Sequence, residues 1–281
     1  MHKSNMKLEV LMYVMYQTDF TLAYKSKIEG DLLIVNQCDE NDYTETIVNG
    51  HKWRMISTTE RGLSKSRNMA LKNAEGDICL WSDDDEVFSD NYAERILEAY
   101  EQLPDACAVV FNVNRINYQM KKRYYHIETI REAPKYRGYQ SGMLSFRRKP
   151  VIEAGIIFDE KFGSGTPWGG GEEILYERDI RELGFKLYEH PFEIATLDYG
   201  GGSQWFKGYN EKYFYNLGAF SYYSTHYRVT IMMIVGVLYT CFYKLRKEKA
   251  LSPLKKVAWM VRGMKGIKKD ITYDAYKALQ V

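Results

Sequence analysis

Four acidic residues follow an apolar run in the segment ICLWSDDDE, residues 78–86. The run has the length and composition of a buried strand, so the acids are expected at its carboxyl end, where open α/β sheets bind ligands. Packed carboxylates repel one another and resist desolvation unless a cation neutralises them. A hard divalent cation such as Mg²⁺ or Mn²⁺, shared with substrate phosphates, would do this. The alternative is an acidic turn that is simply solvated.

A second candidate is Arg67, which the pattern places on the apolar side of a helix. In GLSKSRNMALKNA, residues 62–74, the side chains of Leu63, Arg67 and Leu71 fall on one face at helical spacing. Burial of a guanidinium is unfavourable without an anionic partner. A substrate phosphate or a carboxylate of the acidic cluster could be that partner. A purely structural pair between Arg67 and an aspartate is the alternative.

The third candidate is the pair Glu172 and Glu173, which follows the glycines of WGGGEE, residues 168–173. Glycines allow the backbone to approach a ligand closely, and one carboxylate that faces a pocket could act as a general base. The same two glutamates would also suit the first turn of a helix, where the macrodipole favours negative charge. A structural role is therefore the alternative.

The surrounding sequence predicts the elements that must position these residues. Short apolar runs alternate with helical patterns in the first half of the chain, which indicates an α/β fold with a mostly parallel sheet. The predicted strands are residues 8–16, 31–38, 53–57, 77–81, 106–112 and 142–146. The predicted helices are residues 62–74, a segment that begins at 89 or 90 and ends at Pro104, a short one from Pro150, and one that opens in WGGGEE and ends at Gly184.

In their order along the chain, these pieces resemble the family 2 glycosyltransferases. The segments ERGLSKSRNMALKNAEGDICLWSDDDEVF and, later, WGGGEE follow the family's order of a GLSxxRN helix, an apolar strand, an Asp-rich metal motif and a glycine-preceded pair of acids. The resemblance covers roughly residues 8–220, and it implies a GT-A (Rossmann-like) catalytic domain over residues 1–220. The later segment GGSQWFKGYNEKYFYNLGAF is similar to a subgroup that builds bacterial capsule and exopolysaccharide repeat units. In this segment, Trp205 and Lys207 are candidates for the acceptor side.

The resemblance implies a binding site for a nucleotide-sugar donor. Asp83 and Asp85 would be the outer carboxylates of the DxD-like motif, with Asp85 as the direct ligand of Mn²⁺ or Mg²⁺ and Asp83 or Asp84 near the ribose. Arg67 would help to hold the nucleotide diphosphate. Asp39 matches the position that recognises the base, usually uracil, so the resemblance implies a UDP-sugar as donor.

The resemblance also implies the reaction. Glu173, paired with Glu172, would deprotonate the acceptor hydroxyl as it attacks the anomeric carbon opposite the leaving diphosphate, so that a single displacement inverts the stereochemistry. The implied acceptor is a saccharide linked through a diphosphate to lipid. Two features depart from the commoner family pattern: Ser82 stands where an earlier acid is usual, and the first strand, VMYQTDF, lacks the usual proline and asparagine. The assignment within residues 83–85 therefore stays open.

The C-terminal region, residues 221–281, is predicted to be helical, basic and associated with a membrane. Residues 229–243 carry no charge, and residues 244–269 hold ten Lys or Arg against the single acid Glu248, a net charge of +9 in a chain of +2. The uncharged segment is shorter than the roughly 20 residues of a spanning helix, so an interfacial position on an anionic leaflet is favoured. A helix packed on the catalytic domain with a solvated basic face, or a contact between subunits, is the alternative.

Several broader features bear on location and partners. The four cysteines are scattered without paired spacing, which indicates reduced thiols, and the first residues lack the pattern of a signal peptide. We therefore expect a cytoplasmic protein, peripheral on the inner face of the cell membrane. Nucleic acid is not expected as a partner, because positive charge is confined to a segment beside an apolar run and the rest of the chain is acidic.

Two other classes of function stay open at this point. One is a non-catalytic relative that binds a glycan or a nucleotide, and the other is a nucleic-acid-binding protein that uses the basic tail. The identity of the donor sugar, the acceptor, the linkage and the oligomeric state depends on pocket shape and surface contacts, which a single sequence does not specify.

Overall fold

The computed structural model describes residues 6–117, 125–135, 137–198 and 208–279. The chain divides into two compact units: unit 1 comprises residues 1–160 and 172–202, and unit 2 comprises residues 161–171 and 203–281. The boundary expected at residue 220 separates a catalytic domain from a membrane-associated region, and it stays a prediction. Trp205 and Lys207, the candidates for the acceptor side, lie outside the described residues.

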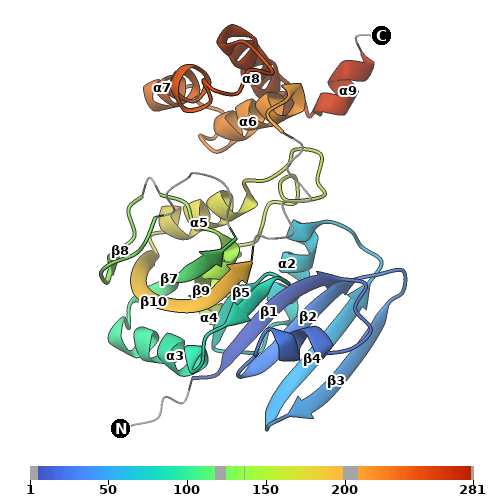
Figure 1. Ribbon diagram of the computed structural model, residues 1–281, viewed down its shortest axis with the longest axis vertical. Helices are drawn as coiled ribbons and strands as arrows, with labels where there is room; N and C mark the ends of the chain where they lie inside the picture. Colours follow the sequence, from blue (N-terminus) through green and yellow to red (C-terminus); the bar gives the residue numbers. More distant parts are fainter. Residues whose placement is uncertain (1–5, 118–124, 136, 199–207, 280–281) are drawn as a thin grey trace. The chain divides into compact units, whose positions relative to one another are not determined.

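The described part of unit 1 contains one sheet of ten strands (Figure 1). The strands are β1 (Leu8–Met15), β2 (Asp31–Gln37), β3 (Asp42–Val48), β4 (His51–Thr58), β5 (Ile78–Ser82), β6 (Glu86–Phe88), β7 (Ala106–Ile116), β8 (Arg131–Glu132), β9 (Leu144–Arg147) and β10 (Lys186–Asp198). Their order across the sheet is β3-β4-β2-β1-β5-β9-β7-β10-β6, and β8 pairs with β10. The neighbours β4, β2, β1 and β5 are parallel, and β9 runs antiparallel between β5 and β7.

The parallel strands bring their carboxyl ends to one edge of the sheet. The register pairs Met15 at the end of β1 with Gln37 of β2, and Met12 with Ser82 at the end of β5. The ends of β2 and β5 are therefore two strand spacings apart across the sheet, roughly 10 Å, and Gln37 lies three residues, roughly 10 Å, farther along the strands than Ser82. Such an edge is where α/β sheets place their ligand sites.

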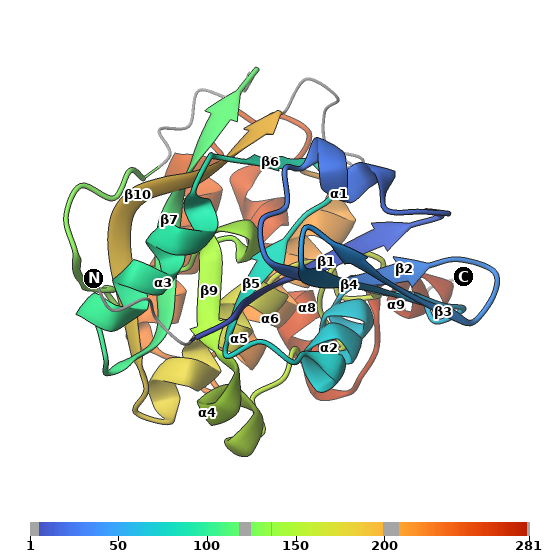
Figure 2. The same cartoon turned by 90° about the horizontal axis from the view of Figure 1, so that it is seen from below.

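Helices cover both sides of the sheet in unit 1. They are α1 (Thr21–Lys25), α2 (Leu63–Asn73), α3 (Tyr92–Gln102), α4 (Arg148–Glu153) and α5 (Glu172–Glu182), with a short 3₁₀-helix η1 (Ser141–Met143). Figure 2 shows α2, α4 and α5 along one side of the sheet and α1 on the other. The chain enters α2 through Gly62, whose φ of +124° would strain any residue with a side chain.

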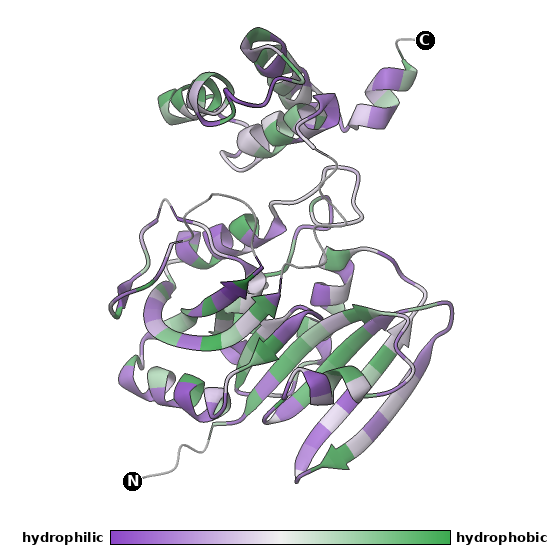
Figure 3. Ribbon diagram, viewed as in Figure 1, coloured by the Kyte–Doolittle hydropathy of each residue, from purple (hydrophilic) through white to green (hydrophobic). Residues whose placement is uncertain are grey.

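An aromatic cluster in the core of unit 1 fixes the end of β5. Trp81 stacks on Phe146 with ring centroids 5.1 Å apart and meets the edge of Phe158 at 5.2 Å, and Phe158 stacks on Tyr176 at 4.3 Å. Figure 3 shows hydrophobic residues concentrated in the central strands. Because Trp81 directly precedes Ser82, this packing holds the start of the acidic segment in place.

The α/β fold predicted from the sequence is confirmed, and each predicted strand and helix of unit 1 is present within a few residues. The strands β3, β6, β8 and β10 and the short helix α1 were not predicted. β3 is exposed along nearly its whole length and therefore has no apolar alternation. β10 contains Pro191 and several charged residues, and its pairing with β7 shifts register at three places.

The helices of the described part of unit 2 are α6 (Glu211–Tyr223), α7 (Ile231–Leu238), the π-helix η3 (Tyr239–Lys244), α8 (Pro253–Lys268) and α9 (Tyr273–Ala278). Glycines let α6 and α8 pack closely, because a Cβ at Gly218 would lie 2.0 Å from the carbonyl oxygen of Met260 and one at Gly263 would lie 1.8 Å from that of Tyr215. None of the helices that the structure describes is both long enough and apolar enough to cross a membrane.

Candidate active site

The acidic turn, Asp83 to Asp85, joins β5 to β6 at the carboxyl edge of the parallel strands. Asp84 and Asp85 are exposed, and Asp83 is half-buried. Desolvation raises the pKa of all three carboxyls, and repulsion from Asp83 and Asp84 helps to raise the pKa of Asp85 to about 6. A nearby cation would relieve the repulsion and lower these pKa values. The turn therefore has the electrostatic properties of a cation site.

Glu86 supports the acidic turn from within the protein. Its side chain is buried, and its Oε2 accepts a hydrogen bond from the backbone N–H of Asp83 at 3.3 Å. A Cβ at residue 142 would lie 1.6 Å from Oε1 of Glu86, so Gly142 leaves the space that this carboxyl occupies. Desolvation, together with the charge of Asp83, raises the pKa of Glu86 well above its usual value. The buried carboxyl therefore stabilises the shape of the turn through its hydrogen bond to the backbone of Asp83.

Arg67 of α2 is enclosed by protein groups, with 1% of its surface exposed. Its Nη1 donates to Glu172 at 2.9 Å, and its Nη2 donates to Glu173 at 3.2 Å and lies 4.0 Å from Asp83. Burial alone would lower the pKa of this guanidinium, but Tyr13, Glu173, Glu172 and Asp83 together raise it. The guanidinium therefore stays charged and links both glutamates to the acidic turn.

The two glutamates of the pair differ in their access to solvent. Both lie in the first turn of α5, as the sequence predicts. The side chain of Glu172 is 7% exposed, whereas that of Glu173 is 27% exposed. Oε1 of Glu173 accepts from Arg67 and, at 3.0 Å, from the backbone N–H of Ser141, and no described residue forms a hydrogen bond with its Oε2. Glu173 thus has a fixed position and an oxygen that can reach a ligand.

Asp39 follows β2 at the same edge of the sheet. Its side chain is 83% exposed, and its Oδ1 accepts a hydrogen bond from Nη2 of Arg61 at 2.8 Å. The guanidinium of Arg61 also lies 5.8 Å from the ring centre of Tyr16. An exposed ion pair of this kind contributes less than about 1 kcal/mol, so a ligand could replace Arg61 at Asp39 at little cost.

The sequence did not identify Tyr13 and Ser141 as part of this network. The hydroxyls of Tyr13 and Ser141 lie 2.9 Å apart and accept hydrogen bonds from Nη2 of Arg67 at 3.0 and 2.7 Å. Tyr13 is one of several residues in an apolar strand, and Ser141 follows a polar segment without a period. Neither carries a local signal, because their role arises only when segments distant in sequence meet.

The donor set fits a divalent cation only in part. Asp83 and Asp85 offer the carboxylate oxygens that Mg²⁺ and Mn²⁺ prefer. Among the residues that the structure describes, however, no group of three or more His, Cys, Asp and Glu side chains is arranged to hold a metal ion. Mg²⁺ commonly takes one or two carboxylates and completes its shell with water and substrate phosphates, so two aspartates are sufficient for a cation that binds together with a nucleotide.

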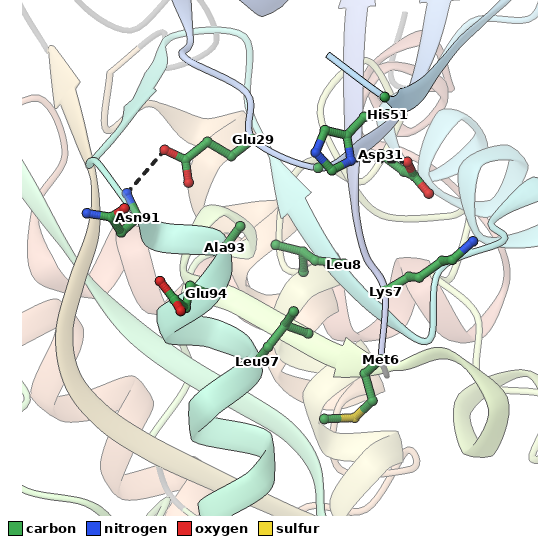
Figure 4. Close-up of a pocket in the computed structure, with 12 residues that line it drawn as sticks. Met6, Lys7, Leu8, Glu29, Asp31, His51, Asn91, Ala93, Glu94 and Leu97 are labelled. Atoms are coloured by element: carbon green, nitrogen blue, oxygen red, sulfur yellow. Dashed lines mark hydrogen bonds and ion pairs between the residues drawn. The ribbon is translucent and has the colours of Figure 1, made fainter. Parts of the chain in front are cut away.

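A separate cavity of about 590 Å³ lies at the amino ends of the strands (Figure 4). Its wall includes Lys7 just before β1, Asp31 at the start of β2 and Asn91 just before α3. The backbone N–H of Asn91 donates a hydrogen bond to Glu29 at 3.1 Å. Because β1 and β5 are parallel, this cavity is at the edge opposite the acidic turn. It is not part of the site formed by Arg67 and its partners.

The sheet and the acidic turn at the end of β5 define a GT-A fold, the fold of many glycosyltransferases. Residues 25–155 match the family described as Glycosyl transferase family 2. This segment therefore belongs to that family, and the resemblance recognised in the sequence is confirmed.

Solved structures of TarS from S. aureus share the fold. TarS 1–349 in complex with UDP-GlcNAc has a TM-score of 0.59 and 13% sequence identity, over 95% of this chain and 93% of that one. TarS 1–349 in complex with UDP has a TM-score of 0.54 and 12% identity over the same shares. At these identities, the likeness shows the fold alone. Among curated proteins, none matches the sequence.

Proposed function

We propose that this protein is an inverting glycosyltransferase that moves a sugar from a nucleotide diphosphate donor to a hydroxyl of a saccharide acceptor. The observation that carries the proposal is the network in which Arg67 holds Glu173 at 3.2 Å while lying 4.0 Å from Asp83 of the acidic turn. This network supports the proposal, because the carboxylate proposed for proton abstraction lies near the carboxylates proposed to hold a cation that binds the diphosphate.

The donor is proposed to be a UDP-sugar that lies along the carboxyl edge of β2, β1 and β5. Asp39 would bind the base, and Asp83 or Asp84 would bind the ribose. The complexes of TarS with UDP-GlcNAc and with UDP support this choice of nucleotide, because the two chains share their fold over most of their length. The ends of β2 and β5 are offset by roughly 10 Å across the sheet and by roughly 10 Å along it, a span that suits a nucleotide that reaches from Asp39 toward the acidic turn.

Asp85 and Asp83 would hold a divalent cation such as Mn²⁺ or Mg²⁺. When bound, that cation offsets the negative charge that grows on the leaving diphosphate. Asp85 is the better ligand of the two, because it is more exposed than Asp83 and its charge is unfavourable without a positive partner. Glu86 would keep the turn in the shape that presents both carboxylates.

Glu173 would act as the general base. Its Oε1 is held by Arg67 and by the backbone of Ser141, so Oε2 would accept the proton of the acceptor hydroxyl as that hydroxyl attacks the anomeric carbon. Glu172 is more deeply buried and is a weaker candidate. The positive charge of Arg67 would fix the orientation of both carboxylates, and its contact with the donor diphosphate stays a prediction.

The wider role is proposed to be surface polysaccharide synthesis in the cytoplasm, with an acceptor linked through a diphosphate to lipid. The similarity of residues 201–220 to enzymes that build capsule and exopolysaccharide units supports this role. All four cysteines are free and buried, which agrees with the reduced thiols expected there.

Calorimetric titration with UDP tests the donor site. Wild-type protein is expected to bind UDP more tightly with Mn²⁺ than without it, and Asp85→Asn is expected to remove most of this gain. Asp90→Asn is the matched control, because Asp90 is an exposed aspartate that pairs with Lys27 at 3.2 Å and lies beyond the turn. Absence of UDP binding with and without Mn²⁺ would overturn the donor assignment, whereas UDP binding without any sugar transfer would favour a non-catalytic relative.

A further inference from the structure

Unit 2 exposes an apolar surface on α7 and η3. Ile231 and Met232 are each 81% exposed, and Val235 is 58% exposed. We call the following residues, each at least 46% exposed, the apolar face: Ile231, Met232, Ile234, Val235, Leu238 and Tyr239. Figure 3 shows α7 coloured as hydrophobic along its length. Soluble proteins rarely leave so continuous an apolar surface in water unless it binds something.

The apolar face is separate from the residues by which the same segment packs into the core of unit 2. Every fourth residue of the same segment, from Met233 through Val237 and Cys241 to Leu245, is buried against the rest of unit 2. The thiol of Cys241 lies 3.6 Å from the sulfur of Met260 in α8. Since this buried stripe already anchors the segment, the apolar residues on its other sides are available for a second contact.

A basic turn follows the apolar face directly. Its exposed cations are Arg246, Lys247 and Lys249. The turn is held in shape by Lys256 of α8, whose buried Nζ donates to the carbonyl oxygens of Leu245 at 2.7 Å and Glu248 at 2.8 Å. The positive charges are thus fixed beside the end of the apolar face rather than spread along a loose tail.

We propose that the apolar face and the basic turn bind the surface of an anionic phospholipid membrane. The apolar side chains would enter the boundary between headgroups and acyl chains, and the three cations would contact the anionic headgroups. The segment of α7 and η3 is too short to span a bilayer, which agrees with a position parallel to the surface. A second copy of the chain is a poorer occupant, because it would add another basic turn to the contact instead of the anionic groups that the first turn requires.

This inference goes beyond sugar transfer, because none of the residues involved belongs to the donor site. Vesicle flotation tests it with two compositions: phosphatidylcholine alone, and equal parts of phosphatidylcholine and phosphatidylglycerol. The full-length protein is expected to float with the anionic vesicles, and high salt is expected to weaken this binding. Equal binding to both compositions, without dependence on salt, would overturn the assignment of the basic turn.

Matched substitutions separate the apolar face from general surface effects. Ile231→Asp with Ile234→Asp is expected to abolish flotation, whereas Ile47→Asp with Ile157→Asp is not. Ile47 and Ile157 are exposed isoleucines of unit 1, at 64% and 57%, and their replacement adds the same two charges. Unchanged flotation of the first variant would contradict the proposal. A second result would also contradict the proposal: analytical ultracentrifugation shows that the wild-type protein is a dimer, the dimer does not bind vesicles, and the Ile231→Asp and Ile234→Asp variant is a monomer.

A second variant tests the charges. Arg246→Gln, Lys247→Gln and Lys249→Gln together are expected to weaken binding to anionic vesicles on the order of 100-fold, since each basic residue near such a surface contributes about a factor of five. Undiminished binding of this triple variant would overturn the proposed role of the turn. Thermal unfolding of the Ile231→Asp and Ile234→Asp variant by circular dichroism, expected to match wild type, separates lost flotation from misfolding. This control does not involve the donor site, so the vesicle result stands even if UDP does not bind.

Discussion

Replacement of Arg67 by lysine distinguishes a residue that positions the glutamates from one that contacts the donor. Lysine keeps the charge but has a single nitrogen, so it cannot reach both Glu172 on the Nη1 side and Glu173 on the Nη2 side. At least one buried carboxylate then loses its partner, which costs about 3 kcal/mol. For a domain of this size that corresponds to a fall in Tm of roughly 6–12 °C.

The assay combines thermal unfolding by circular dichroism with UDP titration well below Tm. If Arg67 acts through the glutamates, Tm falls as stated and the Kd for UDP changes by less than about threefold, well under 1 kcal/mol. Arg54→Lys is the matched control. Arg54 is also buried, with 5% of its surface exposed, and donates to Glu9 at 2.5 Å and to Glu75 at 2.9 Å. Its partner Glu9 lies at the opposite end of β1.

A particular result would refute this reasoning. If Arg67→Lys keeps its Tm within about 2 °C of wild type while the affinity for UDP falls tenfold or more, Arg67 acts directly on the ligand. The diphosphate contact implied by the family resemblance would then be the main role of the residue. Arg54→Lys should lower Tm without any effect on UDP in either case.

Three further outcomes are expected. Glu173→Gln should lower kcat by about 10²- to 10⁴-fold with little change in donor affinity, and Glu172→Gln should lower it less, as steady-state release of UDP can show. Desolvation raises the pKa of Glu177 to about 8, so the folded state binds more protons than the unfolded state between pH 4.5 and 8 and loses stability as pH rises through that window. Glu177→Gln should flatten this dependence in thermal scans across the same range, and an unchanged slope would contradict it. Gly263→Ala should destabilise unit 2 by about 1–3 kcal/mol, because the added methyl would overlap the carbonyl oxygen of Tyr215. Calorimetry should then show an unfolding transition at a lower temperature than in wild type.

The parallel half of the sheet was predictable because each of its strands is buried and reads as a continuous apolar run. β1, β2 and β5 are examples, with almost every side chain inside the protein. The rest depends on long-range pairing. β3 is an exposed edge strand that is held in the sheet by backbone hydrogen bonds to β4. Backbone pairing of this kind does not require a particular pattern of side chains, so the sequence does not reveal it.

The candidate site was predictable as a set of residues but not as a network. The burial of Arg67 followed from helical spacing, and its need for an anionic partner followed from electrostatics. From the sequence, the expected partner is a substrate phosphate or a carboxylate of the acidic cluster. The structure instead brings Glu172 and Glu173 to it, with Asp83 more distant at 4.0 Å. No local pattern links residues more than a hundred positions apart.

The Arg67 network also has a consequence for biosynthesis. Tyr13 and Arg67 leave the ribosome before Ser141, Glu172 and Glu173, and the delay between Arg67 and the glutamates is about 5–20 s for about a hundred residues at about 5–20 residues per second. During that interval, a nascent chain with β1 to β5 already packed would have to bury a guanidinium without its carboxylates. The first half of unit 1 is therefore expected to stay loosely packed and to reach its native packing only after α5 has emerged. Nascent chains that end before α5 should accordingly remain sensitive to protease.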